Sequence, residues 1–364
     1  MVIVQERLPH YRLALFEQIR RQLAGEGIDL AVIHGHAQCQ ATSPRAESQL
    51  PWARVVDNRV FATGRSALVW QPVVKMTADA DLVIVEQASR MAANYVLLAR
   101  QGLGGPRVAF WGHGANLQST GTPASCASEL LKRSVSRRPH WWFAYTEGSA
   151  RRVEALGFPA DRVSVVQNAA DTSLIDAATA LRDPFRCIFV GSLYAAKRLD
   201  IVFEAADLVA AHEPRFELTI VGDGEQRSYV KAQAARRPYV EYAMSLYGKE
   251  LGAELKASSL MLLPGAAGLG ILDGFAAGLP VVAIDADGHG PEIEYLDRDR
   301  NGLLVTGAAP EFADAVLRAL DPSTNDRLRR GCEQTAHEIT LDEMVRRFCI
   351  GIQSALRAKA GAGA

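Results

Sequence analysis

Short apolar runs alternate with segments of helical periodicity along almost the whole chain. Between the runs, apolar residues recur at helical spacing, as they do at Leu15, Phe16, Ile19 and Leu23. Strands that alternate regularly with helices predict an α/β protein built from doubly wound parallel sheets. The runs that predict strands are residues 2–4, 30–33, 82–86, 108–111, 142–145, 163–166, 187–190, 218–221, 260–263, 281–284 and 303–305.

The number of predicted strands points to two domains. A chain of 364 residues exceeds the size at which a single core stops growing, and these strands are too many for one doubly wound sheet. A polar joint with a proline, at residues 181–184, is the best linker. We therefore predict a first domain over residues 1–180, a second over 185–340, and a terminal helix over 341–357. That helix has an apolar stripe at Met344, Val345, Phe348 and Ile352.

Bulk composition excludes several classes of protein. Charged residues make up 22% of the chain and the formal net charge is −1, so no attraction to nucleic acid is predicted. The 5 cysteines are scattered without a CxxC pair, which argues against a disulfide framework or structural zinc and favours a reducing cytoplasm. No apolar stretch approaches the roughly 20 residues of a membrane span. The immediate strand at the start leaves no room for a signal peptide, so any membrane contact is expected to be peripheral.

The most informative segment is residues 262–280, LLPGAAGLGILDGFAAGLP. An apolar run ends in a glycine-rich loop, a helical pattern follows, and a second apolar run begins at Pro280, so the segment predicts one βαβ unit. Small residues let a ligand approach the backbone, where free N–H groups favour phosphate. Asp273 lies about one turn into the predicted helix, where a carboxylate can reach a ribose hydroxyl.

This segment resembles the donor-binding signature of the family-4-type retaining glycosyltransferases, which have the GT-B fold of two Rossmann-like domains. The family reads Glu, seven residues, Glu, then Ala-Met-Ala-x-Gly-x-Pro. Here DGFAAGLP at 273–280 matches the second half, with Asp273 at the second acid, and Gly265 stands at the first. The resemblance implies a ribose contact for Asp273 and backbone contacts from Gly268 and Leu269 to the sugar phosphate. The usual sugar contact of the first acid is missing, and we interpret this as a subfamily feature.

Two further loops of the second half carry the resemblance. Gly191 and Lys197 match a family pattern of Gly-Arg-Leu, three residues and Lys-Gly, whereas Ser192 and Arg198 depart from it. Lys197 is expected to neutralise a leaving diphosphate, and Arg198 to supply the second positive charge that Ser192 lacks. The alternative is a pair of solvated cations at a helix start.

A glycine-rich turn at residues 222–224 and a Pro-Glu-Ile segment at 291–293 complete the predicted donor side. Gly222 and Asp223 follow an apolar run, at the carboxyl end of a strand, where α/β sheets bind ligands. An isolated GxG is usually no more than a turn, so its position between the other motifs is what favours nucleotide contact. Glu292 either caps a helix or contacts the ligand.

The first half contains the predicted acceptor side. His113 stands between two glycines after the run 108–111, and the family commonly has a histidine here, close to the transferred sugar. It is expected to hydrogen-bond a sugar hydroxyl or to stabilise developing positive charge, with Asn116 as a weaker neighbour. Glu147 is a further candidate for the acceptor. His10 and Arg12 lie where an acceptor or phosphate can be met, but they are equally well read as surface polar residues at a helix start.

A local basic and aromatic cluster spans Lys132 to Trp142. Arginine, lysine and tryptophan together suit an anionic membrane surface. A solvated helix end before a buried strand explains the cluster equally well, and nucleic acid is disfavoured by the near-zero charge.

The resemblance implies a metal-independent retaining glycosyltransferase that needs no cofactor, with a nucleotide diphosphate sugar as donor, UDP- or GDP-linked. The expected acceptor is a glycan, a glycolipid or another hydroxyl compound, in bacterial surface polysaccharide or glycoconjugate synthesis on the cytoplasmic side. The terminal helix is expected to cross back to the first domain, as in GT-B proteins. Two alternatives are a non-catalytic nucleotide-sugar binder or assembly partner, suggested by Gly265 and Ser192, and a GT-B sugar-nucleotide epimerase.

Overall fold

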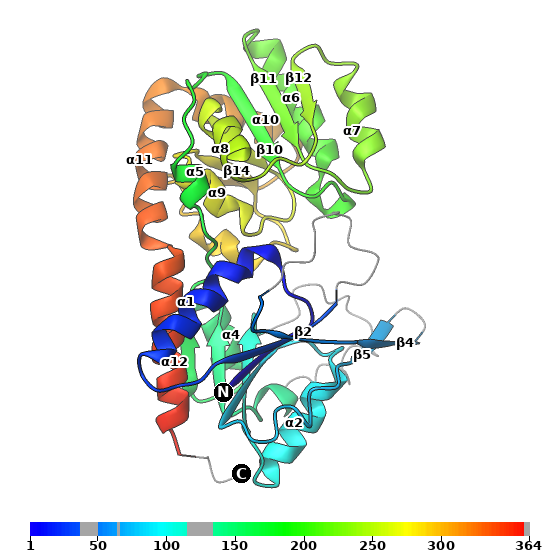
Figure 1. Ribbon diagram of the computed structural model, residues 1–364. Coiled ribbons are helices and arrows are strands. Elements are labelled where there is room, and N and C mark those ends of the chain that lie inside the picture. The colour runs from blue at the N-terminus through cyan, green and yellow to red at the C-terminus, as the bar shows by residue number, and fades with distance from the viewer. Residues whose placement is uncertain (37–49, 64–65, 115–133, 360–364) are drawn as a thin grey trace. The chain divides into compact units, whose positions relative to one another are not determined.

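The computed structural model describes residues 1–36, 50–63, 66–114 and 134–359 (Figure 1). The chain divides into two compact units. The first unit comprises Met1–Asn168 and Leu341–Ala364, and the second comprises Ala169–Thr340. Asn168, the last residue of the first segment, accepts a hydrogen bond from Arg12 of the same unit.

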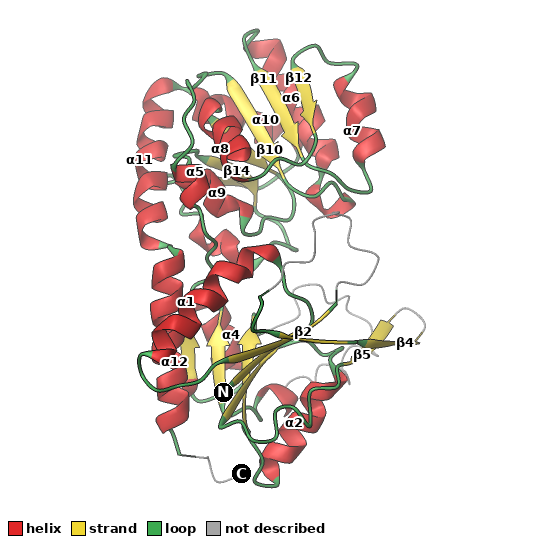
Figure 2. Ribbon diagram, in the orientation of Figure 1, coloured by secondary structure: helices red, strands yellow, loops and turns green. Residues whose placement is uncertain are grey.

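The first unit is built on a seven-stranded sheet in which every strand pair is parallel (Figure 2). Its helices are α1 (Leu13–Ala24), α2 (Ala92–Gly102), α4 (Glu147–Ala155) and α12 (Leu341–Arg357). The central strands are buried along their length, so they appear in the sequence as continuous apolar runs. In spatial order the strands are β3 (Arg54–Val56), β2 (Ala31–Gly35), β1 (Val2–Gln5), β6 (Leu82–Glu86), β7 (Arg107–Gly112), β8 (Trp141–Ala144) and β9 (Val163–Val165).

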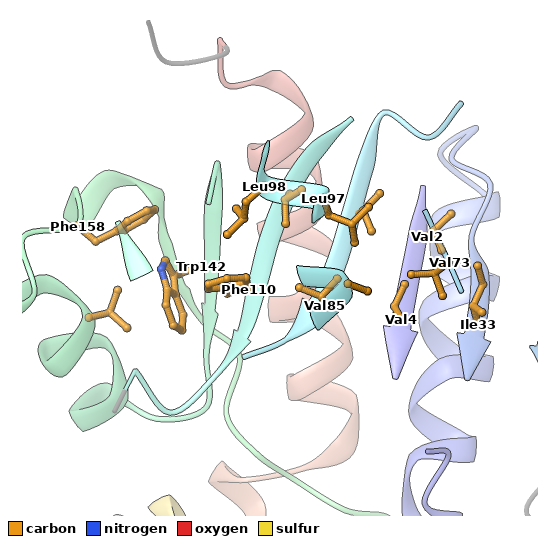
Figure 3. Close-up of a cluster of buried hydrophobic side chains, with 14 residues drawn as sticks. Val2, Val4, Ile33, Val73, Val85, Leu97, Leu98, Phe110, Trp142 and Phe158 are labelled. Atoms are coloured by element: carbon orange, nitrogen blue, oxygen red, sulfur yellow. The ribbon is translucent and has the colours of Figure 1, made fainter. Parts of the chain in front are cut away.

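A cluster of buried side chains fills the space between this sheet and its helices (Figure 3). Val85 and Phe110 come from neighbouring strands, and the Phe110 ring meets Trp142 edge-on at 5.3 Å between centroids. Leu97 and Leu98 cover them from α2. A separate antiparallel hairpin, β4 (Arg59–Thr63) and β5 (Ser66–Trp70), forms its own two-stranded sheet.

The C-terminal helix α12 packs within the first unit, although its sequence follows the second. In Figure 1 it runs beside α1, and its Phe348 ring stacks on Phe143 of β8 at 4.7 Å. The ring nitrogen Nε2 of His140 and the guanidinium of Arg107 bond backbone carbonyls in the last turn of α12. The apolar stripe seen in the sequence is therefore the face that packs on the sheet.

The second unit holds a six-stranded parallel sheet. Its strands lie in the order β12 (Val240–Ala243), β11 (Glu217–Val221), β10 (Arg186–Val190), β13 (Leu260–Leu263), β14 (Val281–Ile284) and β15 (Gly302–Val305). The helices are α5 (Ser173–Asp176), α6 (Leu199–His212), α7 (Arg227–Ala234), α8 (Gly248–Ala257), α9 (Gly270–Ala276), α10 (Ala309–Leu320) and α11 (Pro322–Glu338).

The predicted fold class is confirmed, because both units are α/β with parallel sheets. The sequence analysis missed β3, the β4–β5 hairpin and β12. The strands β3 and β12 lack the continuous apolar runs of the central strands, whereas the apolar run of β5, residues 67–70, was not recognised as a strand. The first unit ends at Asn168, whereas the sequence extended the first domain to residue 180. The ammonium of Lys256 on α8 bonds the carbonyls of Asp176 and Ala178, which ties that stretch to the second unit.

Candidate functional site

The strand order of the second unit identifies where a ligand is expected. From β10 the chain continues to β11 and β12 on one side, then crosses to β13, β14 and β15 on the other. The point where the order reverses lies between β10 and β13, and open α/β sheets bind ligands outside the carboxyl ends of the strands at such a point. The loops after β10 and β13 carry Lys197 and the glycine-rich segment 264–269.

Glycines let the loops after β10 and β11 pack backbone to backbone. A Cβ on Gly222 would overlap the carbonyl oxygen of Gly191, and one on Gly224 would overlap the backbone of Leu193. Both glycines have positive φ, 152° and 155°. The amide of Gly191 donates to Val221 and that of Leu193 to Asp223, at 3.0 and 2.9 Å. The GDG segment is thus a tight turn that holds the neighbouring loop in place.

Lys197 is the cation at the centre of this edge. It ends a short 3-10 helix, Ala195–Lys197, and its ammonium donates to the carbonyl of Ala266 in the loop after β13. Its side chain passes over Gly191, where a Cβ would stand 3.5 Å from Cε. Burial lowers the pKa of Lys197, and the charge of Glu292 opposes that change. The amine therefore sits half-buried among backbone groups, with its charge available to an anion.

The packing around Gly265 leaves no space for the acidic side chain that the family pattern has at this position. A Cβ at this position would overlap the carbonyl oxygens of Ala196 and Lys197. The adjacent amide of Ala266 donates to Ala196 at 2.8 Å, which fixes this close approach. A glutamate does not fit here, so this loop differs from the family pattern by its packing.

Asp273 lies in the first turn of α9, shortly after the loop residues Gly268 and Leu269. Burial raises the pKa of Asp273 to about 7, with no cationic side chain contributing. Within the described residues, no acceptor takes the amide of Gly268 or Leu269. Two backbone donors and one carboxyl group therefore belong to the first turn of α9 and the residues just before it, and none of them has a hydrogen-bond partner in the described part of the chain.

His289 and Glu292 close the site from the segment after β14. The Nδ1 of His289 accepts from the amide of Ala267 at 3.0 Å, and its Nε2 bonds the carbonyl of Ile284 at 2.8 Å. Glu292 is buried, and its carboxylate lies against Gly290 and 4.0 Å from where a Cβ of Gly268 would stand. The sequence analysis gave His289 no role, because one histidine in a loop shows nothing of its partners.

Three other predicted donor residues have clear surroundings. The guanidinium of Arg198 pairs with the carboxylate of Asp200 at 3.1 Å, and both side chains are about half exposed. Asp223 accepts from the amide of Gly224 at 2.8 Å and lies 3.6 Å from Arg227, so its carboxylate is engaged inside its own turn. Ser192 is exposed beside them. An Arg198 contact with diphosphate would require the pair with Asp200 to open.

In the first unit, His113 follows β7 at the carboxyl edge of that sheet. Its ring lies 4.7 Å from the ring of Tyr145, and its buried Nδ1 has no partner among the described residues. Burial, aided by the charge of Arg152, lowers the pKa of His113 to about 4, so the imidazole is neutral near pH 7. Gln87, which the sequence analysis missed, accepts from the amide of Gly114 at 3.1 Å and braces the histidine loop.

Arg12 is a buried residue of the scaffold, so its interpretation as a surface residue is wrong, and its contact with an acceptor stays a prediction. It is 4% exposed, and its guanidinium donates to Asn168 at 2.5 Å and lies 4.6 Å from the ring centre of Trp111. His10 is exposed next to it, in contact with Tyr11. Glu147 is exposed in the first turn of α4. Asn116 falls outside the described residues.

The prediction that residues 132–142 form a membrane-contacting surface is wrong for Trp141 and Trp142. Trp141 and Trp142 are 5% and 0% exposed because they belong to β8 and pack in the sheet. Lys132 lies outside the described residues. No helix in the described ranges is long and apolar enough to cross a membrane. In the same ranges, no three metal-binding side chains gather into a group.

Part of the chain is similar in sequence to known glycosyltransferases. Residues 184–322 match the family described as glycosyl transferases group 1. The amylovoran biosynthesis glycosyltransferase AmsK of Erwinia amylovora is 26% identical over 187 residues, which are 47% of this chain and 45% of that protein. The aligned region therefore spans less than half the length of the curated relative.

Solved structures resemble the chain over nearly its full length. HepE of Anabaena, in complex with UDP, has a TM-score of 0.71 at 16% identity and covers 97% of this chain and 99% of its own. The lipopolysaccharide outer core galactosyltransferase WaaB, in its apo form, has a TM-score of 0.66 at 16% identity, with the same coverage. At these identities the likeness establishes the fold. Residues 184–322 therefore match the glycosyl transferases group 1 family, and the fold of the chain as a whole is the GT-B fold.

Proposed function

We propose that this protein is a glycosyltransferase that uses a nucleoside diphosphate sugar, UDP- or GDP-linked, bound in the second unit. The observation that carries the proposal is the half-buried ammonium of Lys197 at the switch point, beside the open amides of Gly268 and Leu269. An ammonium and backbone N–H groups together match a diphosphate. In this proposal Asp273, in the first turn of α9, accepts hydroxyls of the ribose. The UDP and UDP-glucose complexes of HepE support a uridine donor.

The proposed reaction is retaining and independent of metal. The bond between the sugar C1 and the diphosphate breaks, the acceptor oxygen bonds C1 on the same face, and the acceptor proton passes to the leaving diphosphate. Lys197 stabilises the charge that develops on the diphosphate, an effect that is large in a site from which water is excluded. His113, neutral because of its low pKa, hydrogen-bonds the sugar or the acceptor.

A glycan or lipid-linked acceptor in bacterial surface polysaccharide synthesis is part of the proposal. AmsK is a glycosyltransferase of amylovoran biosynthesis and WaaB is a galactosyltransferase of the lipopolysaccharide outer core, and both support this proposal. In this proposal the first unit supplies the groups for the acceptor, with His113 after β7 and Gln87 after the neighbouring strand β6.

The test is calorimetric binding of UDP, GDP, ADP, dTDP and CDP to the purified protein. One nucleotide should bind tightly and should bind the Asp273→Ala variant at least about tenfold more weakly, because the ribose contact is lost. The preferred nucleotide then selects the sugars for a turnover assay. If none of the nucleotides binds, the donor site is refuted.

A non-catalytic nucleotide-sugar binder is the second candidate, because Gly265 and Ser192 replace charged family residues. The close packing around Gly265 leaves no space for a side chain, so the glycine is part of the loop's structure, which argues against this candidate. A donor sugar that binds but is neither transferred nor hydrolysed, with every acceptor class tried, would favour this candidate.

A further inference from the structure

His289 connects two segments of the second unit that sequence places far apart. It follows β14, and its side chain is 9% exposed. Because Nδ1 accepts from the amide of Ala267, this nitrogen carries no proton, and Nε2 carries the hydrogen that it donates to the carbonyl of Ile284. The ring thus joins the end of its own strand to the loop after β13.

The loop bonded by His289 is the one that receives Lys197. Ala266 is the neighbour of Ala267. The amide of Ala266 donates to the carbonyl of Ala196 at 2.8 Å, and the carbonyl of Ala266 accepts from the Lys197 ammonium. On the other side, the amide of Gly290 donates to the carbonyl of Ala267 at 2.7 Å. The Ala266–Ala267 peptide is therefore held by Ala196 and Lys197 on one side and by His289 and Gly290 on the other.

We propose that His289 is a positioning residue that fixes the segment 264–269, and through the Ala266 carbonyl fixes the Lys197 ammonium, in the geometry that receives the donor diphosphate. This inference rests on the proposed function for its catalytic consequence. Its structural part, the restraint of residues 264–269 by Nδ1, can be tested on the protein without any ligand.

The two ring nitrogens can be separated by substitution. The side-chain oxygen of asparagine stands near the position of Nδ1, so His289→Asn keeps an acceptor for Ala267 and loses the bond to Ile284. The longer glutamine places its amide near Nε2, so His289→Gln keeps the bond to Ile284 and loses the acceptor. His289→Ala loses both. His212→Asn is the matched control, because that histidine is exposed and bonds the carbonyl of Leu208 within its own helix.

Hydrogen exchange followed by mass spectrometry on peptides covering residues 264–269 gives the first readout. In His289→Gln and His289→Ala we expect the amides of Ala266 and Ala267, which are hydrogen-bonded in the wild type, to exchange about five- to tenfold faster, as the loss of one hydrogen bond predicts. His289→Asn and His212→Asn should exchange at the wild-type rate. Equal protection in the Asn and Gln variants, or wild-type protection in the Ala variant, would overturn the proposal.

UDP calorimetry and turnover give the second readout. Because misplacing Lys197 weakens stabilisation of the transition state more than binding of the donor, kcat should fall about tenfold in His289→Gln and KM should change less. Asn should restore kcat, which general destabilisation by substitution would not produce. If the wild type itself fails to bind UDP or turn over a donor, the proposed function fails, whereas the exchange experiment still decides the role of His289.

Discussion

The two units differ in the hydrogen bonding of polar groups at the carboxyl edges of their sheets. In the second unit, the loops around Lys197 are joined by backbone hydrogen bonds and by glycines that admit close contact, and Gln226 Oε1 is a buried side-chain atom without a partner among the described residues. In the first unit, such buried atoms are more numerous, at His113 Nδ1, Trp111 Nε1 and Gln167 Oε1. Gln167 also has a positive φ of 56°, which is strained for a residue with a side chain.

This difference suggests how each unit meets its ligand. A site whose loops bond each other is pre-organised, so it loses little free energy in ordering when a diphosphate binds. Buried polar atoms without partners cost free energy until a ligand or water satisfies them. We therefore propose that the second unit presents a preformed anion site and that polar groups of the first unit hydrogen-bond the acceptor sugar.

Replacement of the central cation should have the largest effect. We expect Lys197→Ala to lower turnover by on the order of a hundredfold or more, because the charge that stabilises the diphosphate is lost. Steady-state kinetics with the preferred donor measures this. Lys249→Ala, at an exposed lysine of α8, is the control and should leave turnover unchanged. Near-normal turnover in Lys197→Ala would remove the preformed anion site from the comparison.

A substitution in the first unit should affect turnover and spare donor binding. We expect His113→Ala to lower kcat about tenfold or more, since one hydrogen bond to the reacting sugars is lost, with UDP affinity unchanged. Calorimetry and kinetics on the same preparation separate the two quantities. A loss of UDP affinity equal to the loss of kcat would show that His113 belongs to the donor site, and the contrast between the units would then fail.

The smallest effect is expected from pH. The pKa of Asp273 is about 7 in the folded protein against a model value of 3.8, so the folded state binds more protons between these values. Its contribution to stability is therefore fully present below about pH 4 and is lost as pH rises through about 7. UDP affinity should change in the opposite direction and rise through about pH 7, because the ionised carboxylate accepts ribose hydroxyls. Asp273→Asn should flatten the stability profile, measured by thermal unfolding between about pH 4 and pH 8, and the affinity profile, measured by calorimetry between about pH 6 and pH 8. Unchanged profiles in this variant would mean that another group titrates.

Much of the fold could be predicted because the central strands are buried on both faces and their apolar runs are continuous. The motif around Asp273 and Lys197 was also visible, since glycines and charged residues stand at fixed offsets from those runs. The edge strand β12 has only four residues, of which Val240 alone is buried, so it escaped detection.

The sequence by itself determined that the chain forms parallel α/β sheets, and it identified Lys197 and Asp273 as residues of one candidate site. Only the tertiary structure decided that Arg12 is buried against Trp111, that Trp142 belongs to a core, and that His289 holds the loop beside Lys197. The physical reason is that periodicity along the chain reports which face of an element is buried. The partner of a polar atom depends on which loops the strand order brings together, and in a parallel sheet those loops come from distant parts of the sequence.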